Sequence, residues 1–391
     1  MRSKLELDRP WSTTVSNEIE RCNLCVLPKS DQFGFDDHGT CSLCNAAKRT
    51  STESEDMEGA KVLEEYIQRI KDRGRKQPFD CVVGISGGRD SSYLLYLLTH
   101  KHHLRCLAAY YRTPFTSDVT DANVRRLTSI LNVPLVELGV SHELHRRVAK
   151  EFTILWTEKP LPVIAHMACA PCKLLNREIF KLARANGIGA VVYGGNRFEA
   201  VQIASGAWHD ETLTTSAMAA RQLALMGQLQ KSLRLMKEGV DVLKVSTKLW
   251  KYLPLGVQAS IMYICPHTAY LRFRYPRIFT LEYFCFGEWE EKESEEALAQ
   301  LGWELPPGCN STWKSDCSFA ELKNYMFQKM TGVGYMDAFL SNMVRAGIIS
   351  RDEALKRIKV EGRVSVERLT DAFETMELPD ELSTLFLQEA A

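Results

Sequence analysis

The feature that most constrains the fold is an apolar run that passes directly into a loop rich in glycine and serine. The run "DCVVGI" (80–85) is typical of a strand buried on both faces of a sheet. The loop "SGGRDSS" (86–92) follows it, and a leucine-rich segment with the character of a helix follows the loop. A buried strand, a tight loop and a helix in direct succession are typical of an α/β fold with a parallel sheet.

The same alternation continues to about residue 200. Further strand-like runs are 105–111, 134–140 and 189–195, and segments with helical spacing are 60–71, 121–132, 141–156 and 175–188. We therefore predict a doubly wound, mostly parallel sheet over 76–200. In such sheets, ligands bind at the loops that follow the strands.

Outside this region the pattern changes, and we predict three parts. Residues 1–56 form a cysteine-bearing module with a linker, 57–205 an α/β domain, and 206–391 a mainly helical region that contributes to the substrate site. The polar stretch 48–59 is expected to be the linker. Segment 214–252 has helical spacing, 261–290 resists assignment, and short helices are expected from Phe319 onward.

Composition excludes several classes of protein. The 49 basic residues balance 49 acidic ones, so the global positive charge typical of many nucleic-acid-binding proteins is absent. No apolar run is long enough to cross a bilayer, and the first residues lack the apolar core of a secretion signal. We expect a soluble, cytoplasmic protein without a membrane partner. Its twelve cysteines then indicate metal binding or catalysis rather than disulfides.

Four of the cysteines form two Cys-x-x-Cys pairs, separated by fifteen residues: Cys22, Cys25, Cys41 and Cys44. Each pair can place two thiolates on one tetrahedral ion, and the intervening loop returns the second pair to the first. The spacing predicts a closed, structural zinc site. A tetrathiolate iron site has similar spacing.

The glycine-serine loop has the composition of an anion site. Gly87 and Gly88 permit positive φ and leave the amides open to a ligand, and the following helix adds its positive N-terminal end. Asp90 is suited to hold magnesium, and Arg89 is expected to point to solvent. The residues expected to contact phosphate are Ser86, Gly87, Gly88, Asp90, Ser91 and Ser92.

These residues carry a family resemblance. "SGGRDSS" matches the SGGxDS signature of the PP-loop, or N-type, ATP pyrophosphatases, which have an adenine nucleotide alpha-hydrolase-like fold. The resemblance implies that the loop binds the pyrophosphate of ATP and that the enzyme adenylylates a carbonyl oxygen. Gly195 and Asn196, after the fourth strand, would then face the ATP cleft, as would Glu199. A non-catalytic nucleotide-binding scaffold is an alternative, against which the intact loop argues.

Within that superfamily, most of the chain is similar to the N-acetyl sugar amidotransferases of the WbpG/PseA type. The likeness rests on the four cysteines, the loop, "VVYGGN" (191–196), "LGWELPP" with "STWKSDC" (301–317) and "RAGIISRDEAL" (345–355). It implies transfer of ammonia to a nucleotide-linked N-acetyl sugar. A separate glutaminase subunit would supply the ammonia, and a homo-oligomer is expected.

A second likeness points to sulfur transfer. Cys169-Ala-Pro-Cys172 resembles the Cys-x-x-Cys of the iron-sulfur tRNA thiolases, which implies a 4Fe-4S cluster with Cys317 as third ligand. Catalytic roles would then fall to Asp90, Cys172 and Cys317. Cys265, Cys285 and Cys309 are weaker third ligands, and the pair is also compatible with redox or core thiols. The zero net charge disfavours tRNA as a partner.

Overall fold

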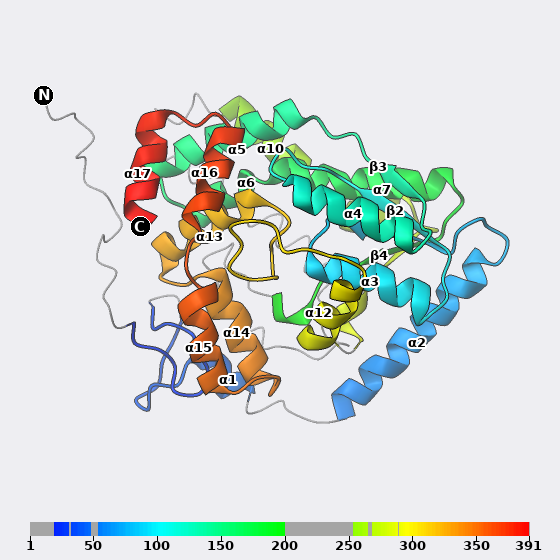
Figure 1. Ribbon diagram of the computed structural model, residues 1–391, viewed down its shortest axis with the longest axis horizontal. Coiled ribbons are helices and arrows are strands. Elements are labelled where there is room, and N and C mark those ends of the chain that lie inside the picture. The colour runs from blue at the N-terminus through cyan, green and yellow to red at the C-terminus, as the bar shows by residue number, and fades with distance from the viewer. Residues whose placement is uncertain are drawn as a thin grey trace, which may run out of the picture.

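The computed structural model describes residues 19–30, 33–47, 54–199, 253–264, 268–287 and 289–390 (Figure 1). The predicted helical segment at 214–252 therefore lies outside the described residues. Within the described residues, no helix combines the length and the apolar character needed to cross a membrane.

A five-stranded parallel sheet forms the centre of the α/β region, in the order β3-β2-β1-β4-β5. Every neighbouring pair is parallel, with Val83 opposite both Ala108 and Val192. The predicted α/β class and parallel sheet are thus confirmed. The strands are β1 (Cys81–Ile85), β2 (Cys106–Tyr110), β3 (Leu135–Glu137), β4 (Ala190–Tyr193) and β5 (Phe279–Glu282).

Strand β5 lies in the segment that resisted assignment. It has only four residues at the edge of the sheet, of which Leu281 is buried and the other three are half-buried. Its neighbours in sequence are also short elements, so no helical or strand period extends far enough to be recognised. These elements are α10 (Leu253–Ile264), α11 (Thr268–Arg274) and the 3₁₀ turn η5 (Tyr283–Cys285).

Helices cover both faces of the sheet because successive side chains of each strand point to opposite sides. Val83 belongs to the hydrophobic cluster that contains residues of α2, α3 and α4, whereas Val82 belongs to the cluster formed with α7 and α11. The bounds are α2 (Ser54–Gly74), α3 (Arg89–His100), α4 (Asp118–Ile130) and α7 (Leu174–Ala185). The expected linker at 48–59 is wrong in part, since α2 begins inside it and has an apolar stripe that packs on the sheet.

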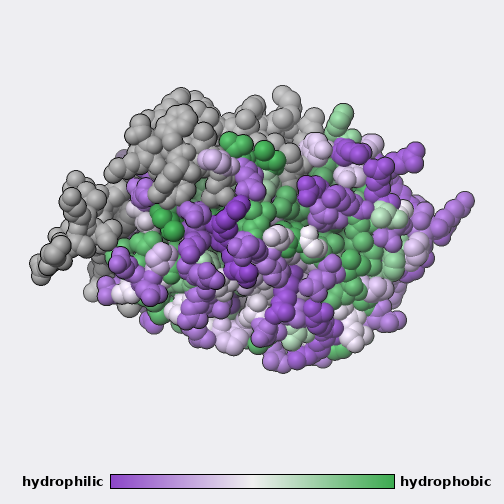
Figure 2. Space-filling model, turned by 90° about the horizontal axis from the view of Figure 1, so that it is seen from above, coloured by the Kyte–Doolittle hydropathy of each residue, from purple (hydrophilic) through white to green (hydrophobic). Residues whose placement is uncertain are grey.

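Of the remaining helices, α12, α14 and α15 pack in the cluster that contains Val83, and others build a second hydrophobic cluster beside the sheet. Residues of α5, α6, α13, α16 and α17 share it, so segments far apart in sequence lie together (Figure 1). Hydrophilic residues cover much of the described part of the face seen from above, with hydrophobic ones exposed between them (Figure 2). The elements are α5 (His142–Glu158), α6 (Pro162–Met167), η1 (Ala170–Lys173), α12 (Glu291–Gln300), α13 (Ser318–Thr331), α14 (Tyr335–Arg345), α15 (Arg351–Glu361), α16 (Val366–Thr375) and α17 (Asp380–Ala390).

Candidate functional site

The loop after β1 lies at the switch point of the sheet. From β1 the chain continues through β2 to β3 on one side, and returns to place β4 on the other side of β1. The loops that leave β1 and β4 therefore diverge, which opens a crevice at the carboxyl ends of these two strands. The two sequence segments with predicted site residues, 86–92 and 194–196, are those loops.

Gly87 has the conformation that requires glycine. Its φ is +88°, and a Cβ there would stand 2.6 Å from Thr120 Cγ2 and 2.8 Å from the Thr120 carbonyl oxygen. Gly88 is the N-cap of α3 with φ of −71°, so positive φ is confined to Gly87. The loop thus reaches α3 through one tight turn at Gly87.

Hydrogen bonds within the loop hold its hydroxyl groups. The backbone N–H of Ser86 donates to Ser91 Oγ at 3.1 Å, and Ser91 Oγ donates to the Gly88 carbonyl at 3.1 Å. The two serine hydroxyl oxygens are 3.1 Å apart. Ser92, which the sequence placed among the phosphate contacts, is fully buried in α3 and does not line the cavity. The loop therefore presents Ser86 and Ser91 to a ligand.

A cavity of about 420 Å³ opens in front of this loop. Its lining includes Ser86, Gly88, Asp90 and Ser91 from the first loop, and Gly194 and Gly195 from the loop after β4. The other walls come from α7, β5 and the segment 312–316. A volume of this size is that of a small-molecule site, and it lies where doubly wound sheets bind ligands.

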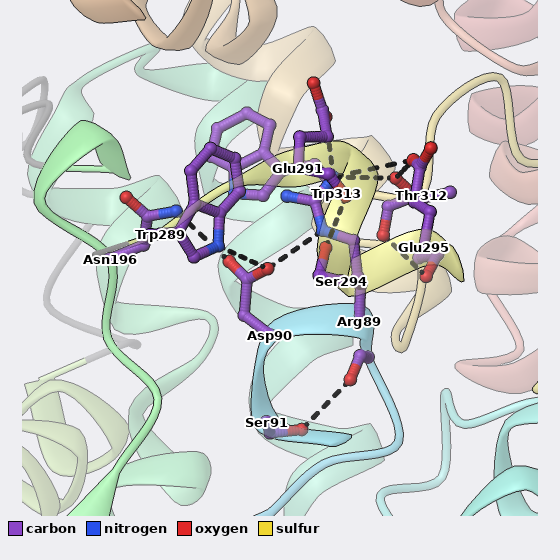
Figure 3. A network of polar contacts seen from close by, with 12 residues as sticks. Arg89, Asp90, Ser91, Asn196, Trp289, Glu291, Ser294, Glu295, Thr312 and Trp313 are labelled. Atoms are coloured by element: carbon purple, nitrogen blue, oxygen red, sulfur yellow. Dashed lines mark hydrogen bonds and ion pairs between the residues drawn. The ribbon is translucent and has the colours of Figure 1, made fainter. Parts of the chain in front are cut away.

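Asp90 joins the two loops (Figure 3). Its Oδ1 accepts hydrogen bonds from Arg89 Nε at 2.9 Å and from Trp289 Nε1 at 3.2 Å. Its Oδ2 accepts one from Asn196 Nδ2 at 3.4 Å. Because Asn196 follows β4 and Asp90 follows β1, this carboxylate fixes the two sides of the crevice relative to each other.

Arg89 is buried, so the expectation that it points to solvent is wrong. Its Nη1 forms an ion pair with Glu291 at 2.6 Å and donates to Thr312 Oγ1 at 2.8 Å. Glu291 also pairs with Arg357 of α15 at 2.5 Å. The guanidinium stacks on Trp289, 4.9 Å from the ring centroid. Besides Asp90, the partners that balance this buried charge come from the chain after residue 280, and the sequence near the loop does not reveal them.

Two carboxylates lie deeper in the cavity. Glu199 accepts a hydrogen bond from Trp313 Nε1 at 2.6 Å, and burial raises its pKa. Glu282 accepts one from the Gly195 backbone N–H at 3.2 Å, and burial raises its pKa to about 7. The sequence analysis missed Glu282 because it missed β5. The glutamate that ends the run Phe279–Glu282 is the sequence feature by which Glu282 could have been recognised.

We expect Glu282 to make stability depend on pH. Its pKa is raised from 4.5 to about 7 in the folded chain, so the folded state holds this proton more tightly and stability falls as pH rises through that interval. Glu282→Gln should therefore raise the free energy of unfolding by about 3 kcal/mol at pH 8 and by a fraction of that at pH 5. Urea unfolding at both pH values measures this. Glu296→Gln, an exposed change on α12, is the matched control, and equal gains at both pH values would contradict the prediction.

The structure also brings the second set of cysteines together. Cys169 and Cys317 pack against the same hydrophobic cluster. The pKa of Cys172 is raised, mainly by burial and also by the charges of Cys169 and Cys317. Cys172 Sγ lies 3.6 Å from His145 Nε2, and His145 Nδ1 lies 3.1 Å from the Tyr111 hydroxyl. Burial lowers the pKa of His145 to about 3, so its imidazole is neutral. His145 and Tyr111 were not predicted.

The weaker candidates for a third ligand are spread out. Cys285 Sγ lies 3.9 Å from the Gly195 carbonyl, and Cys309 Sγ lies 3.8 Å from the Ser315 carbonyl. Cys265 lies outside the described residues. By contrast, Cys317 lies close enough to Cys172 for its charge, like that of Cys169, to raise the pKa of Cys172.

The four N-terminal cysteines form a compact, buried cluster. All four sulfurs lie within 4.8 Å of one another, with Cys22 and Cys44 at 3.9 Å and Cys25 and Cys41 at 3.8 Å. Backbone N–H groups point at two of them, from Cys41 to Cys22 at 3.3 Å and from Leu27 to Cys25 at 3.5 Å. Four converging thiols with N–H donors around them fit a tetrahedral metal ion.

The cluster packs against the helices near the other end of the chain (Figure 1). Arg345 at the end of α14 donates to Cys25 Sγ at 3.3 Å. Arg351 at the start of α15 donates to the carbonyl oxygens of Cys22 and Cys25 at 3.1 and 3.0 Å. α14 also approaches the cavity, because Asn342 Nδ2 donates to the Phe198 carbonyl at 2.7 Å, next to Glu199.

No protein-family model matches the chain, and no curated protein matches it. Among solved structures it is similar to an NMN synthetase from Francisella tularensis, with 18% identity and a TM-score of 0.26, over 37% of this chain and 56% of that one. It is similar to an NH3-dependent NAD synthetase from Campylobacter jejuni, with 13% identity and a TM-score of 0.27, over 53% of this chain and 96% of that one.

A third solved structure covers nearly the whole chain. It is the U34-tRNA thiolase NcsA from Methanococcus maripaludis with its [4Fe-4S] cluster, with 13% identity and a TM-score of 0.32, over 93% of this chain and 90% of that one. Similarities of this size carry no argument about activity, which rests instead on the residues of the cavity.

Proposed function

We propose that the chain is an ATP-dependent synthetase that adenylylates a carbonyl oxygen and transfers nitrogen from ammonia to a nucleotide-linked N-acetyl sugar. The observation that supports this most is the loop 86–92. It has a glycine in the left-handed conformation at the switch point of the sheet, and it opens onto a cavity of about 420 Å³. The resemblance of the loop to the SGGxDS signature supports ATP as the ligand.

The loop amides and the N-terminal end of α3 would bind the pyrophosphate of ATP, with the hydroxyls of Ser86 and Ser91 beside it. Magnesium travels with nucleotide phosphates and takes oxygen ligands. Asp90 fits that role poorly in this arrangement, because its oxygens already accept bonds from three N–H donors. Asp316 lines the cavity beside Gly88 and offers its carboxylate oxygens there. Magnesium would neutralise charge on the phosphates.

The chemistry proceeds in two displacements. The acetamido carbonyl oxygen attacks the α-phosphorus of ATP, and pyrophosphate leaves. The nitrogen of ammonia then attacks the activated carbon, the bond from this carbon to oxygen breaks, and AMP leaves with that oxygen. Glu282, with a pKa of about 7, is suited to accept the proton that the incoming nitrogen loses. The product is an amidine.

An isotope experiment tests this route. The sugar nucleotide is prepared with ¹⁸O in its acetyl carbonyl and incubated with ATP, magnesium and ammonium. We expect AMP that carries one ¹⁸O in its phosphate, because the carbonyl oxygen leaves with AMP. Mass spectrometry of AMP and ³¹P resonance of the phosphate detect it. Unlabelled AMP, or ADP and phosphate in its place, would contradict adenylylation of the carbonyl.

The four-cysteine cluster is proposed to hold zinc as a structural ion. Cys22, Cys25, Cys41 and Cys44 would be its ligands, and Arg345 would partly balance the charge of the thiolates. Zinc with four thiolates supplies folding energy rather than chemistry. We further propose the division at 56 and 205, a homo-oligomer, and a separate glutaminase subunit as the source of ammonia.

A second candidate function is sulfur transfer by an iron-sulfur cluster. The observation that favours it is the convergence of Cys169, Cys172 and Cys317, three thiols from η1 and the start of α13. Among the described residues these three do not meet the spacing of a single-ion site. A cluster binds each thiolate to a different iron, so its ligands stand further apart than those of one ion.

We expect protein purified without oxygen to be colourless, free of iron and sulfide, and active in nitrogen transfer. Iron and sulfide analysis, visible absorption and the activity of Cys172→Ser measure this, with Cys309→Ser as the matched control. About four irons and four sulfides per chain, lost in Cys172→Ser and kept in Cys309→Ser, would contradict the proposal of nitrogen transfer and support sulfur transfer.

A further inference from the structure

A second cavity lies at the end of the strands opposite to the loop 86–92. It has a volume of about 760 Å³. Its lining includes Gln77, Gly189 and Ile278, which precede β1, β4 and β5. It therefore opens at the amino ends of the strands, whereas the cavity discussed above opens at their carboxyl ends. We call it the arginine groove.

Charge distinguishes the arginine groove from the rest of the molecule. Four of its eleven lining residues are arginines, and none of these described lining residues is acidic. They come from four separate places: Arg73 in α2, Arg184 in α7, Arg274 at the end of α11 and Arg277 before β5. In a chain with a net charge of zero, four cations around one concave surface create a local positive potential that attracts anions.

The four groove arginines are exposed, whereas the buried Arg89 and the half-buried Arg357 have carboxylate partners. Arg89 pairs with Asp90 and Glu291, and Arg357 with Glu361. No ion pair is found for the four groove arginines with the carboxylates of the part of the chain that the structure describes. Within the described residues, the positive charge of the groove is therefore not offset by ion pairs.

Three of the four arginines, Arg73, Arg184 and Arg274, have contacts that leave donors open. Arg73 Nη1 donates to the Arg277 carbonyl at 2.9 Å, and its guanidinium lies 5.1 Å from the centroid of Phe279. The guanidiniums of Arg184 and Arg274 lie 5.8 and 5.5 Å from the centroid of Tyr275. Packing on a ring uses the face of a guanidinium and leaves its edge N–H groups free to form paired hydrogen bonds with phosphate.

We propose that the arginine groove binds the polyphosphate group of a small molecule. Four guanidiniums match the several negative charges of a triphosphate, whereas one carboxylate would offset only one of them. The concave shape favours a compact ligand over an extended strand. Single-stranded nucleic acid would need open aromatic faces for base stacking, and guanidiniums already lie over Tyr275 and Phe279.

Titration with inorganic tripolyphosphate by calorimetry tests this proposal. The wild-type chain should bind two equivalents, one in the groove and one at the loop 86–92. Arg184→Gln with Arg277→Gln should weaken only the groove site, by tenfold or more, because each charge-assisted contact to phosphate contributes strongly. The matched control is Arg146→Gln with Arg147→Gln, an equal change of charge on α5, which should bind like the wild type.

Further arms separate this proposal from the proposed function. Gly87→Ala, or Ser86→Ala with Ser91→Ala if the former does not fold, should remove only the loop site. If the wild type binds one equivalent and the groove variant loses it, the groove proposal holds and ATP binding at the loop does not. Unchanged binding by the groove variant overturns the proposal.

Two further measurements test which ligand the groove binds. Oligouridine that binds the wild type but not the groove variant, with no binding of tripolyphosphate there, also overturns the proposal and assigns the groove to nucleic acid. Sodium ATP and tripolyphosphate, compared in competition, distinguish a nucleotide from inorganic polyphosphate.

Discussion

Replacing Asp90 by alanine should abolish the release of AMP and pyrophosphate while the chain stays folded. Asp90 accepts hydrogen bonds from Arg89, Trp289 and Asn196, and so fixes the loop after β1 against the loop after β4. Without it the two sides of the cavity lose their common anchor. A displacement of about 1 Å between reacting groups costs on the order of 100-fold in rate, so we expect at least about 100-fold loss.

The fold should tolerate the change because the surrounding charges stay balanced. Arg89 and Arg357 share the carboxylates of Asp90, Glu291 and Glu361, so two cations still face two anions without Asp90. Circular dichroism and urea unfolding check folding, and chromatography of AMP measures activity. Glu295→Ala, an exposed residue 3.9 Å from Arg89, is the control. Wild-type release of AMP by the Asp90 variant would remove the case for this loop as the reacting centre.

Removal of metal from the four-cysteine cluster should destabilise the chain by several kcal/mol. Structural zinc sites contribute about 10–16 kcal/mol of apparent binding energy in small domains, and part of that is lost as folding free energy when the ion is removed. Cys25→Ser should act like a chelator, because it removes a ligand that also accepts from Arg345. Metal analysis by mass spectrometry and thermal unfolding measure both effects.

The controls for this prediction are two other thiols. Cys106→Ala changes a buried cysteine of β2 that lies 3.7 Å from Cys81, and Cys309→Ser changes a half-buried one. Neither should change the metal content. Because α14 contacts both the cluster and the Phe198 carbonyl, loss of metal should also weaken ATP binding. Full retention of metal by Cys25→Ser would contradict the assignment of the cluster.

The central part of the fold could be predicted because its signals are local. The run 80–85, the glycine loop and the helix after it are adjacent in sequence, and the spacing of the four cysteines is a property of 22–44 alone. Burial of Arg89 depends instead on Glu291 and Thr312, more than 200 positions away. Glu282 was missed for a related reason: a four-residue edge strand has too few positions to display a period.

The second set of cysteines shows a third case. Cys169 and Cys172 stand out by their spacing, but their surroundings come from α5 and from Tyr111, through His145. A histidine inside an amphipathic helix carries no sign in the sequence of whether it contacts a thiol, water or a core side chain. Only packing of α5 against η1 decides it.

The contacts of Arg345 and Arg351 with the cysteine cluster have a consequence for synthesis on the ribosome. Arg345 follows Cys25 by 320 positions. Arg351 follows Cys22 by 329 positions and Cys25 by 326. At roughly 5–20 residues per second, the ribosome needs about 15–60 s to supply them after the cysteines emerge. For that interval the nascent thiols lack their covering helices, so their capture by a metal ion competes with oxidation before the last helices arrive.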